Sequence, residues 1–417
     1  FSVSQINSPY SRYGLGDVSP NIGNVVNRSM GGVSTAYRDF QSVNFLNPAT
    51  YTNIRVTTYD VSTEVESRTM SNADKSDKFN SANFLFNYLT IGVPLNRRGT
   101  WGMALGLRPI TKMNYKIESN ERIYFNQNAS DSIATLYEGS GGSYNAFAGM
   151  GAKWGGLSIG FNTGYHFGQS EISTRRIFDN DTIVYNKSNS ATNTSFGNIF
   201  LETGLQYQVK LSDKKLLRLG ATYSLQQKLN ASKDILRETF SYSGNGSTYQ
   251  LDSVYMNTVS GKINYPESYS VGLLYEELDK WMIGVQYDVT NWNRFSMYDE
   301  KQTNEIASNY MLRIGGQVTP KMGDQSFWNR NTYRAGFYFG KDFIDIRNNQ
   351  LPVYGITLGA GIPIRRFSYY SNQFTTVNVG FEYGKRGNSN ASISENIFKI
   401  NVGLSLSDIW FIKRKYD

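Results

Sequence analysis

The chain has 417 residues, a formal net charge of +8 and no cysteine, which excludes disulfide staples and thiolate metal sites. Aromatic residues make up 14% of it, glycine occurs 39 times, and the mean hydropathy is only −0.45. No run approaches the roughly 20 apolar residues of a membrane-spanning helix. Many aromatics and many short alternating segments in a polar chain favour a transmembrane β-barrel. The alternative is a large soluble β-sandwich or propeller, although the blade repeats of a propeller are not found.

Residues 1–52 lack the alternation that marks a strand. They are rich in Gly, Ser and Asn and carry scattered charges, among them Arg12 and Arg28. The segment is too polar to face lipid and too aromatic for a plain linker. We therefore expect an N-terminal plug in the lumen of a barrel formed by residues 53–411, followed by a periplasmic tail at 412–417. The absence of a leader before Phe1 suggests that a signal peptide has been removed.

Alternation of apolar and polar residues begins near residue 54 and recurs along the rest of the chain. In residues 397–407, for example, Phe398 and Val402 alternate with Lys399 and Asn401. Successive side chains of a strand point to opposite faces, so each such segment has one apolar face and one polar face. Charges on the polar face would be costly in a dry core, but they suit a polar lumen. Fourteen strands are expected, at about 54–67, 80–94, 100–116, 141–154, 156–172, 196–211, 215–230, 266–278, 280–295, 306–320, 331–345, 352–364, 366–386 and 392–409.

Short and long connections alternate between these segments. Tight turns at 96–99, 155–156, 212–215, 279–280 and 365–366 follow even-numbered strands, whereas long polar stretches at 117–140, 173–195 and 231–265 follow odd-numbered ones. Outer-membrane barrels have short periplasmic turns and long external loops. The sequence thus predicts an all-β, 14-stranded antiparallel transmembrane β-barrel in a bacterial outer membrane, with both termini in the periplasm. The 231–265 stretch is long enough for a β-hairpin above the barrel.

Aromatic residues gather near the expected strand ends. Trp101, Trp154, Trp281 and Trp292 are examples. Amphipathic rings favour the membrane–water interface, so these side chains are expected there.

Three expected external loops contain the pattern Asp-Ser/Thr-aliphatic, centred on Ser132, Thr182 and Ser253. The pattern resembles the O-glycosylation sites of Bacteroidota. Ordinary loop composition produces the same triplets, so modification at these three residues is one of two readings.

Short motifs at both ends of the chain resemble a known family. Residues 28–32 (Arg-Ser-Met-Gly-Gly, with Gly31 and Gly32) and 45–49 (Phe-Leu-Asn-Pro-Ala, with Asn47, Pro48 and Ala49) resemble the signature of FadL-type outer-membrane transporters. The stretch 8–14 and the tail 410–416 are similar to those of FadL-like barrels of Bacteroidota. The resemblance implies a porin-like 14-stranded barrel with a plug built around these residues and Arg12.

In its transporter members, the family releases hydrophobic molecules sideways at a kinked third strand. Here the third expected strand carries Arg108, Pro109 and Ile110, and a proline cannot donate to a strand ladder. One reading is a lateral gate at these residues. The other is a simple bend of the strand near the outer rim.

Two functions follow from the resemblance. The first is passive transport of a hydrophobic small molecule, which predicts a continuous, partly apolar tunnel. The second is a non-transporting barrel subunit of a multi-protein outer-membrane complex, in β-barrel assembly or type 9 secretion, which predicts a sealed lumen. The inward faces, with few large apolar residues, do not favour a greasy tunnel.

The expected partners follow from the two functions. They are outer-membrane lipids and lipopolysaccharide, and either a hydrophobic small molecule or other barrels and surface lipoproteins. No basic stripe interleaves with stacking aromatics, so nucleic acid is not an expected partner. The single histidine, His166, is expected to face the lumen on the same side as Asn162, a pair that resembles part of a barrel hydrolase site. Such an enzyme needs a Ser or Asp partner within reach, and one histidine on a strand is weak evidence, so no enzyme is expected. The sequence has no His/Cys cluster, so no cofactor or metal site is expected either.

Overall fold

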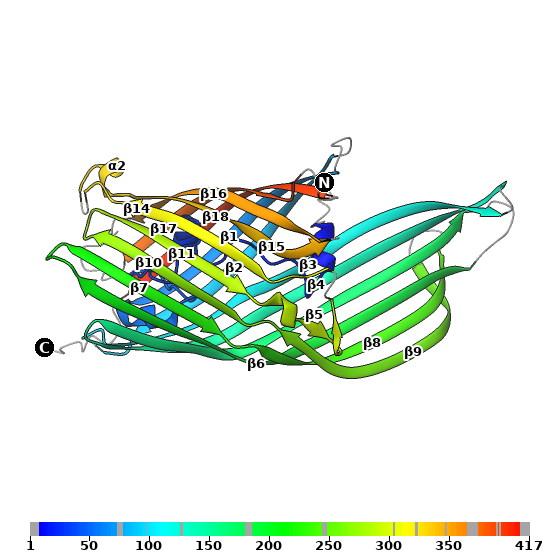
Figure 1. Ribbon diagram of the computed structural model, residues 1–417, viewed down its shortest axis with the longest axis horizontal. Coiled ribbons are helices and arrows are strands. Elements are labelled where there is room, and N and C mark those ends of the chain that lie inside the picture. Colours follow the sequence, from blue (N-terminus) through cyan, green and yellow to red (C-terminus); the bar gives the residue numbers. More distant parts are fainter. Residues whose placement is uncertain are drawn as a thin grey trace, which may run out of the picture.

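A closed 14-stranded antiparallel β-barrel forms most of the computed structural model (Figure 1). The structure describes residues 8–72, 78–96, 98–125, 128–179, 186–243, 248–302, 305–321, 324–346, 348–364, 374–388, 391 and 393–408. The barrel strands follow one another in chain order, and β1 pairs with β18 to close the wall. No helix among these residues is long and apolar enough to span a membrane.

The count of fourteen wall strands is confirmed, but their bounds differ from the expected ones. The strands between residues 101 and 210 are longer, whereas those expected at 215–230 and 280–295 end at Ser224 and Thr290. The expected turn at 365–366 and the start of the expected strand 366–386 lie outside the described residues. The wall consists of β1 (Thr57–Asn72), β2 (Lys78–Pro94), β3 (Trp101–Phe125), β4 (Asn128–Trp154), β5 (Leu157–Asp179), β6 (Lys187–Lys210), β7 (Lys215–Ser224), β10 (Ser268–Glu277), β11 (Trp281–Thr290), β14 (Asn309–Val318), β15 (Thr332–Ile346), β16 (Asn349–Ile364), β17 (Phe374–Arg386) and β18 (Ile393–Asp408). The other elements are η1 (Pro9–Arg12), α1 (Val25–Arg28), η2 (Pro48–Asn53), β8 (Gln227–Tyr242), β9 (Thr248–Tyr265), η3 (Trp292–Arg294), β12 (Ser296–Met297), β13 (Glu300–Lys301) and α2 (Phe327–Arg330).

The apolar face of the strands points outward. In β18, Phe398, Val402 and Leu406 are exposed, whereas Lys399 and Asn401 are buried toward the lumen. The same holds around the wall for Phe84, Leu105, Ile159, Phe161, Ile199, Leu219, Val271, Ile283, Val285, Ile314, Ile356, Leu358 and Phe381. An apolar belt around the outside of the wall is the kind of surface that fits the hydrocarbon layer of a bilayer.

Three of the stretches expected as external loops are strands. Residues 117–125 and 128–140 continue the β3–β4 ladder, and residues 173–179 and 187–195 continue β5 and β6. The expected hairpin in 231–265 is confirmed, since β8 pairs with β9 and also with the first half of β6. Figure 1 shows these strands reaching past the rest of the barrel at the end opposite α2. We call this sheet of β3–β6, β8 and β9 beyond the barrel wall the extension.

The wall is open on one side of its outer half. β2 pairs with β3 only from Leu89–Leu107 to Pro94–Gly102, although both strands continue well past these residues. From Arg108 onward, β3 therefore has β4 on one side and no wall strand on the other among the described residues.

The N-terminal segment, residues 8–54, runs through the lumen from one end to the other. β1 begins opposite the end of β18, with Thr57 beside Asp408, at the end that carries the short turns. Ser8, in contrast, donates a hydrogen bond to Glu395 near the start of β18, at the opposite end. The barrel thus begins and ends on one side, but the first described residue does not lie there. The orientation relative to the membrane stays a prediction, and the tail at 412–417 is outside the described residues.

Candidate functional site in the barrel lumen

Glycines of the wall receive the backbone of the N-terminal segment. A Cβ at Gly315 or Gly336 would overlap the main chain at Met30. The same is true of Gly160 against Pro48 and its neighbour. Further wall glycines that face the segment in this way are Gly102, Gly151 and Gly220. Main chain packs directly on main chain at these positions, so larger residues would push the segment out of place.

Gly31 and Gly32 are the points where the segment turns against the wall. Both have a positive φ, +68° and +88°, which residues with a Cβ rarely adopt. The N–H of Gly31 donates to Thr357 Oγ1 at 2.8 Å. Arg313 Nη1 donates to the carbonyl of Gly31 at 3.1 Å, which fixes the turn to β14. The positive φ angles therefore explain why glycine occupies positions 31 and 32 of the sequence motif.

The Asn-Pro-Ala motif begins η2. Asn47 accepts from the N–H of Ala49 at 3.1 Å and donates through Nδ2 to the carbonyl of Thr35 at 2.6 Å. Pro48 takes the first turn of the helix, where a missing N–H costs nothing. The motif thus ties two parts of the segment together beside β4 and β5.

Arg28 lies in a buried ion pair with the wall. It donates to Glu64 of β1, and both side chains are below 10% exposed. Lys399 of β18 lies 3.8 Å from the same carboxylate and 3.4 Å from Glu66. Arg12, in contrast, is exposed and donates to the hydroxyl of Tyr13 at 2.5 Å, and it joins neither buried network among the described residues.

Asp17 is the centre of a second buried network. Its carboxylate lies 2.8 Å from Arg386 of β17 and 3.1 Å from Arg68 of β1. Both arginines also contact Glu395, at 3.5 and 3.0 Å. Burial acts to raise the pKa of Asp17, but the two arginines prevail and lower it from 3.8 to about 2. Asp342 of β15 completes the cluster as a further acceptor from Arg386.

An apolar cluster fills the lumen at the far end. Tyr10, Tyr13 and Leu15 of the segment pack with Trp292 and Phe343, and the last two rings stack at 4.3 Å. Trp292 is therefore buried inside the barrel, and its expected place at the membrane interface was wrong. The chain folds inward at η3, which no local pattern marks. Trp101 and Trp154 do form an exposed pair, 6.2 Å apart, at the end with the short turns.

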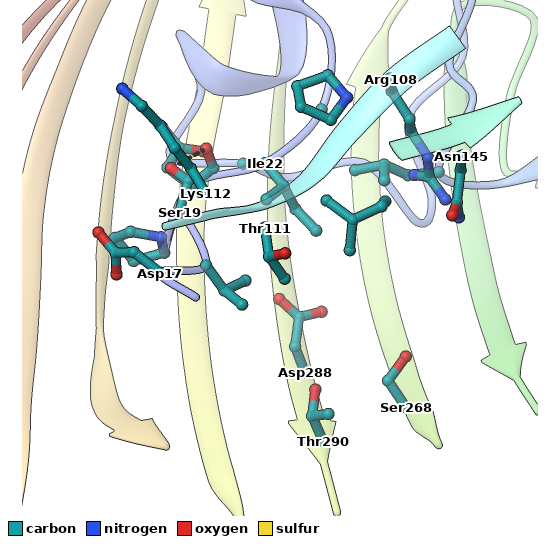
Figure 2. Close-up of a pocket in the computed structure, with 18 of the residues that line it drawn as sticks. Asp17, Ser19, Ile22, Arg108, Thr111, Lys112, Asn145, Ser268, Asp288 and Thr290 are labelled. Carbon is teal, nitrogen blue, oxygen red and sulfur yellow. Dashed lines mark hydrogen bonds between the residues drawn. The ribbon is translucent and has the colours of Figure 1, made fainter. Parts of the chain in front are cut away.

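A cavity of about 680 Å³ remains between the segment and the wall (Figure 2). Figure 2 shows Asp17, Ser19 and Ile22 of the segment and Lys112 and Asp288 of the wall among the residues that line it. The cavity reaches Phe84–Asn87 of β2 and residues 108–114 of β3, which lie where these two strands are no longer paired. Ile22 is 45% exposed there. Both charged and apolar side chains line the cavity, so its surface is not uniformly apolar.

The three residues expected at a gate have different surroundings. Arg108 is buried and bonds Glu202 of β6 at 2.6 Å, with its guanidinium 5.4 Å from the ring of Phe45. Pro109 follows the last β2–β3 pair, and the β3–β4 register shifts between Pro109 and Thr111, leaving Ile110 as the bulged residue. A bulge next to Pro109 fits both a lateral gate and a simple bend of the strand. That a gate moves here stays a prediction.

The remaining sequence candidates lie on strands or outside the described residues. His166 is buried and its Nδ1 is 2.8 Å from Gln227 Oε1, while Asn162 bonds the N-terminal segment instead. Within the described part of the chain, no group of three His, Cys, Asp or Glu side chains could hold a metal. Ser132 and Ser253 lie in strands β4 and β9 rather than in loops, and Thr182 is outside the described residues. Glycosylation is untested.

The two buried ion networks escaped the sequence reasoning. One signal was present: Glu64, Glu66 and Arg68 alternate on the inward face of β1. Three charges on one face of a strand indicate a set of partners across the lumen. Their partners, Arg28 and Asp17, come from a segment without any periodic pattern, so the pairing itself was not predictable.

Comparison with known proteins agrees with this geometry. A family model described as BamG matches residues 1–417. No curated protein matches the sequence. Among solved structures, the CymD monoaromatic hydrocarbon channel is 14% identical, with a TM-score of 0.57, and covers 93% of this chain and 98% of its own. A Pseudomonas aeruginosa FadL homologue is 11% identical, with a TM-score of 0.58, and the match covers 95% of this chain and 100% of that one. The Pseudomonas putida toluene transporter TodX is 13% identical, with a TM-score of 0.55, and the match covers 95% of this chain and 100% of that one. These likenesses show the FadL-like barrel fold; an origin in Bacteroidota stays a prediction.

Proposed function

The chain belongs to the BamG family, and we propose on this premise that it is a sealed barrel subunit of a larger outer-membrane assembly. Its lumen would serve as structural support, and its work would be done by surfaces that contact other proteins. Outer-membrane residence is part of the proposal, supported by the apolar belt and the closed barrel fold.

The fixed N-terminal segment is the observation that carries this proposal. Its main chain lies against wall glycines on several strands, and its charges Asp17 and Arg28 are paired with buried wall residues. Breaking one partner of a buried ion pair costs about 3 to 5 kcal/mol. A segment held by two such networks is suited to act as a permanent plug, whereas a channel needs a plug that yields or leaves a tunnel.

The chemistry of the cavity supports the same choice. Asp17, Lys112, Glu202 and Asp288 line it together with apolar residues. An apolar ligand would have to displace water from charged groups without replacing its hydrogen bonds, which is unfavourable. The family description, BamG, also hints at a partner in β-barrel assembly.

Extraction from native outer membranes in mild detergent, followed by the mass of the intact particle, tests the proposal. We expect an assembly that contains other barrels and surface lipoproteins. A particle of only 47.1 kDa plus detergent would contradict it. In planar bilayers the purified barrel should conduct little, and deletion of residues 1–50 should increase the leak. A deletion that leaves a tight barrel would remove the plug role.

Passive transport of a hydrophobic small molecule is the second candidate. The β2–β3 opening favours it, because the cavity meets this opening beside Phe84 and Pro109. The solved structures described as hydrocarbon channels and toluene transporters share the fold. Uptake of toluene into liposomes would decide between the two. The sealed subunit predicts uptake at the level of empty liposomes, whereas a transporter predicts uptake that Pro109→Val slows while folding is intact.

A further inference from the structure

The outer edge of β9 is an unpaired strand edge in the extension. β9 pairs with β8 from one end to the other, and on its other side the strand that pairs with it among the described residues is β12, at Ile263 and Asn264. The N–H of Tyr298 donates to the carbonyl of Lys262 at 2.9 Å, which marks the end of this cover. Among the described residues, nothing pairs with the outer edge of residues 249–260.

The regular part of this edge is residues 255–260. The β8–β9 ladder has two register shifts, after Arg237 and after Thr239 of β8. Both lie opposite the part of β9 that precedes residue 255, so the pairing is irregular there. In an antiparallel ladder every second residue points its N–H and C=O away from its partner strand. About three residues of the regular stretch therefore offer donors and acceptors outward, over a length of ~20 Å.

The side chains of this edge do not discourage strand addition. Residues 255–260 contain no charged residue and no proline. Met256 is 76% exposed and Tyr255 is 44% exposed, on opposite faces of the sheet. Proteins usually protect free edges with charges, prolines or coverage.

The free edge of β3 at the other side of the extension has such protection. Residues 113–122 carry Lys116, Glu118, Glu121 and Arg122. Nearer the barrel, the N-terminal segment covers this edge, since Asp17 and Lys112 exchange main-chain hydrogen bonds of 2.8 and 3.0 Å. The two edges of this sheet thus differ in chemistry. Among the described residues, the β9 edge at 255–260 is uncharged and has no paired strand, whereas the β3 edge is charged and partly covered.

We propose that the β9 edge accepts an extended segment of a membrane-anchored partner at the cell surface, which adds to the sheet as a further strand. This inference rests on the proposed function as a subunit of an assembly. The added strand would satisfy the outward backbone groups and cover Tyr255 and Met256 from both sides. Apolar or β-branched side chains on the incoming strand suit these neighbours.

Area indicates that the partner has a second attachment. A strand of about six residues covers much less than the roughly 1,200 Å² of a stable interface. Anchoring both proteins in one membrane raises their effective concentration and makes a small contact sufficient.

A second copy of this chain does not fit the edge. Two copies in one membrane are related by an axis along the membrane normal. If β9 keeps the tilt of about 35 to 45° that the strands of outer-membrane barrels have, the β9 strands of two such copies would cross at about 70 to 90° and could not pair.

Cross-linking from a single introduced cysteine tests the position. The chain has no cysteine, so Met256→Cys gives one attachment point for a benzophenone maleimide on outer membranes. Tyr137→Cys, on the interior strand β4 of the same extension and 38% exposed, is the matched control. We expect one discrete partner adduct at position 256 and none at 137. Equal adducts at both positions, or a product of twice the chain's own mass, would overturn the proposal.

Substitution at the edge separates this inference from the proposed function. Met256→Lys with Val259→Lys should reduce the co-purified surface partner roughly tenfold, while Tyr137→Lys leaves it unchanged. In the wild-type assembly, amide exchange should slow for residues 249–260 and not for 113–122. If the wild type assembles but neither effect appears, the edge is not the site and the subunit role stands. If the wild type extracts alone, the subunit role fails and the edge proposal falls with it.

Discussion

The inner barrel and the extension share β3–β6 but are stabilised differently. In the inner barrel each strand has two neighbours, except where β2 and β3 separate, and the N-terminal segment lies in the lumen with its charges paired. In the extension β3–β6, β8 and β9 continue as an open sheet with two free edges. The difference indicates that rigidity is concentrated inside the wall, whereas surface available to partners lies beyond it.

Loss of Arg386 should have the largest effect on the inner barrel. Arg386→Met leaves Asp17, Asp342 and Glu395 with one partner fewer in a buried place. We expect the free energy of unfolding to fall by about 3 to 5 kcal/mol, measured by denaturant titration of the barrel in detergent. Lys210→Met, which removes an exposed pair with Asp213, is the control and should change little. An equal effect of both substitutions would contradict the special role of the lumen.

A methyl group at Gly336 should have the next largest effect. Its Cβ would overlap the main chain at Met30 and Gly31, so Gly336→Ala should displace the segment at a cost of about 1 to 3 kcal/mol. Protease cleavage within residues 8–54 should become faster. Ala335→Val adds volume to the outward face of the same strand, where the side chain is exposed, and should leave cleavage as in the wild type. Faster cleavage in both variants would show that bulk anywhere on β15 loosens the segment.

Acid should release part of the stability that Asp17 supplies. Its pKa in the folded protein is about 2, below the ordinary value of 3.8. A lowered pKa gives stability that is fully present above pH 4 and is lost as the pH falls through 2, about 2 kcal/mol in all. Pepsin, which is active at these pH values, should cleave the segment progressively faster between pH 4 and 2. In Asp17→Asn, cleavage should be faster at pH 4 and change less with pH; parallel profiles would contradict the assignment.

The sequence predicted the inner barrel better than the extension, for a physical reason. Alternation of side chains with lipid outside and lumen inside is a local signal, and residues such as Phe398 and Lys399 carry it in adjacent positions. Beyond the membrane both faces meet water, so residues 117–125 pair through their main chains without any apolar face to mark them. The expected loops there were strands for this reason.

The lumen contacts were only partly predictable. Gly31, Gly32 and Pro48 have conformational or steric reasons that a motif can record. The pairing of Asp17 with Arg68, 51 residues later, depends on how the segment crosses the lumen. The position of Trp292 was predicted wrongly for a similar reason. The chain turns into the lumen between β11 and β14, and no periodic pattern in the sequence marks this turn.

The smallest expected effect belongs to the extension. Met256→Ala removes a large side chain that is 76% exposed, so it should change the free energy of unfolding of the isolated barrel by less than about 0.5 kcal/mol. Denaturant titration of the purified chain measures this, with Leu274→Ala, a fully buried side chain of β10, as the destabilising counterpart. A cost at position 256 close to that at 274 would mean that part of this chain already covers the β9 edge. Near-neutrality at 256 leaves that surface free for a partner, so that substitutions there change assembly and not folding.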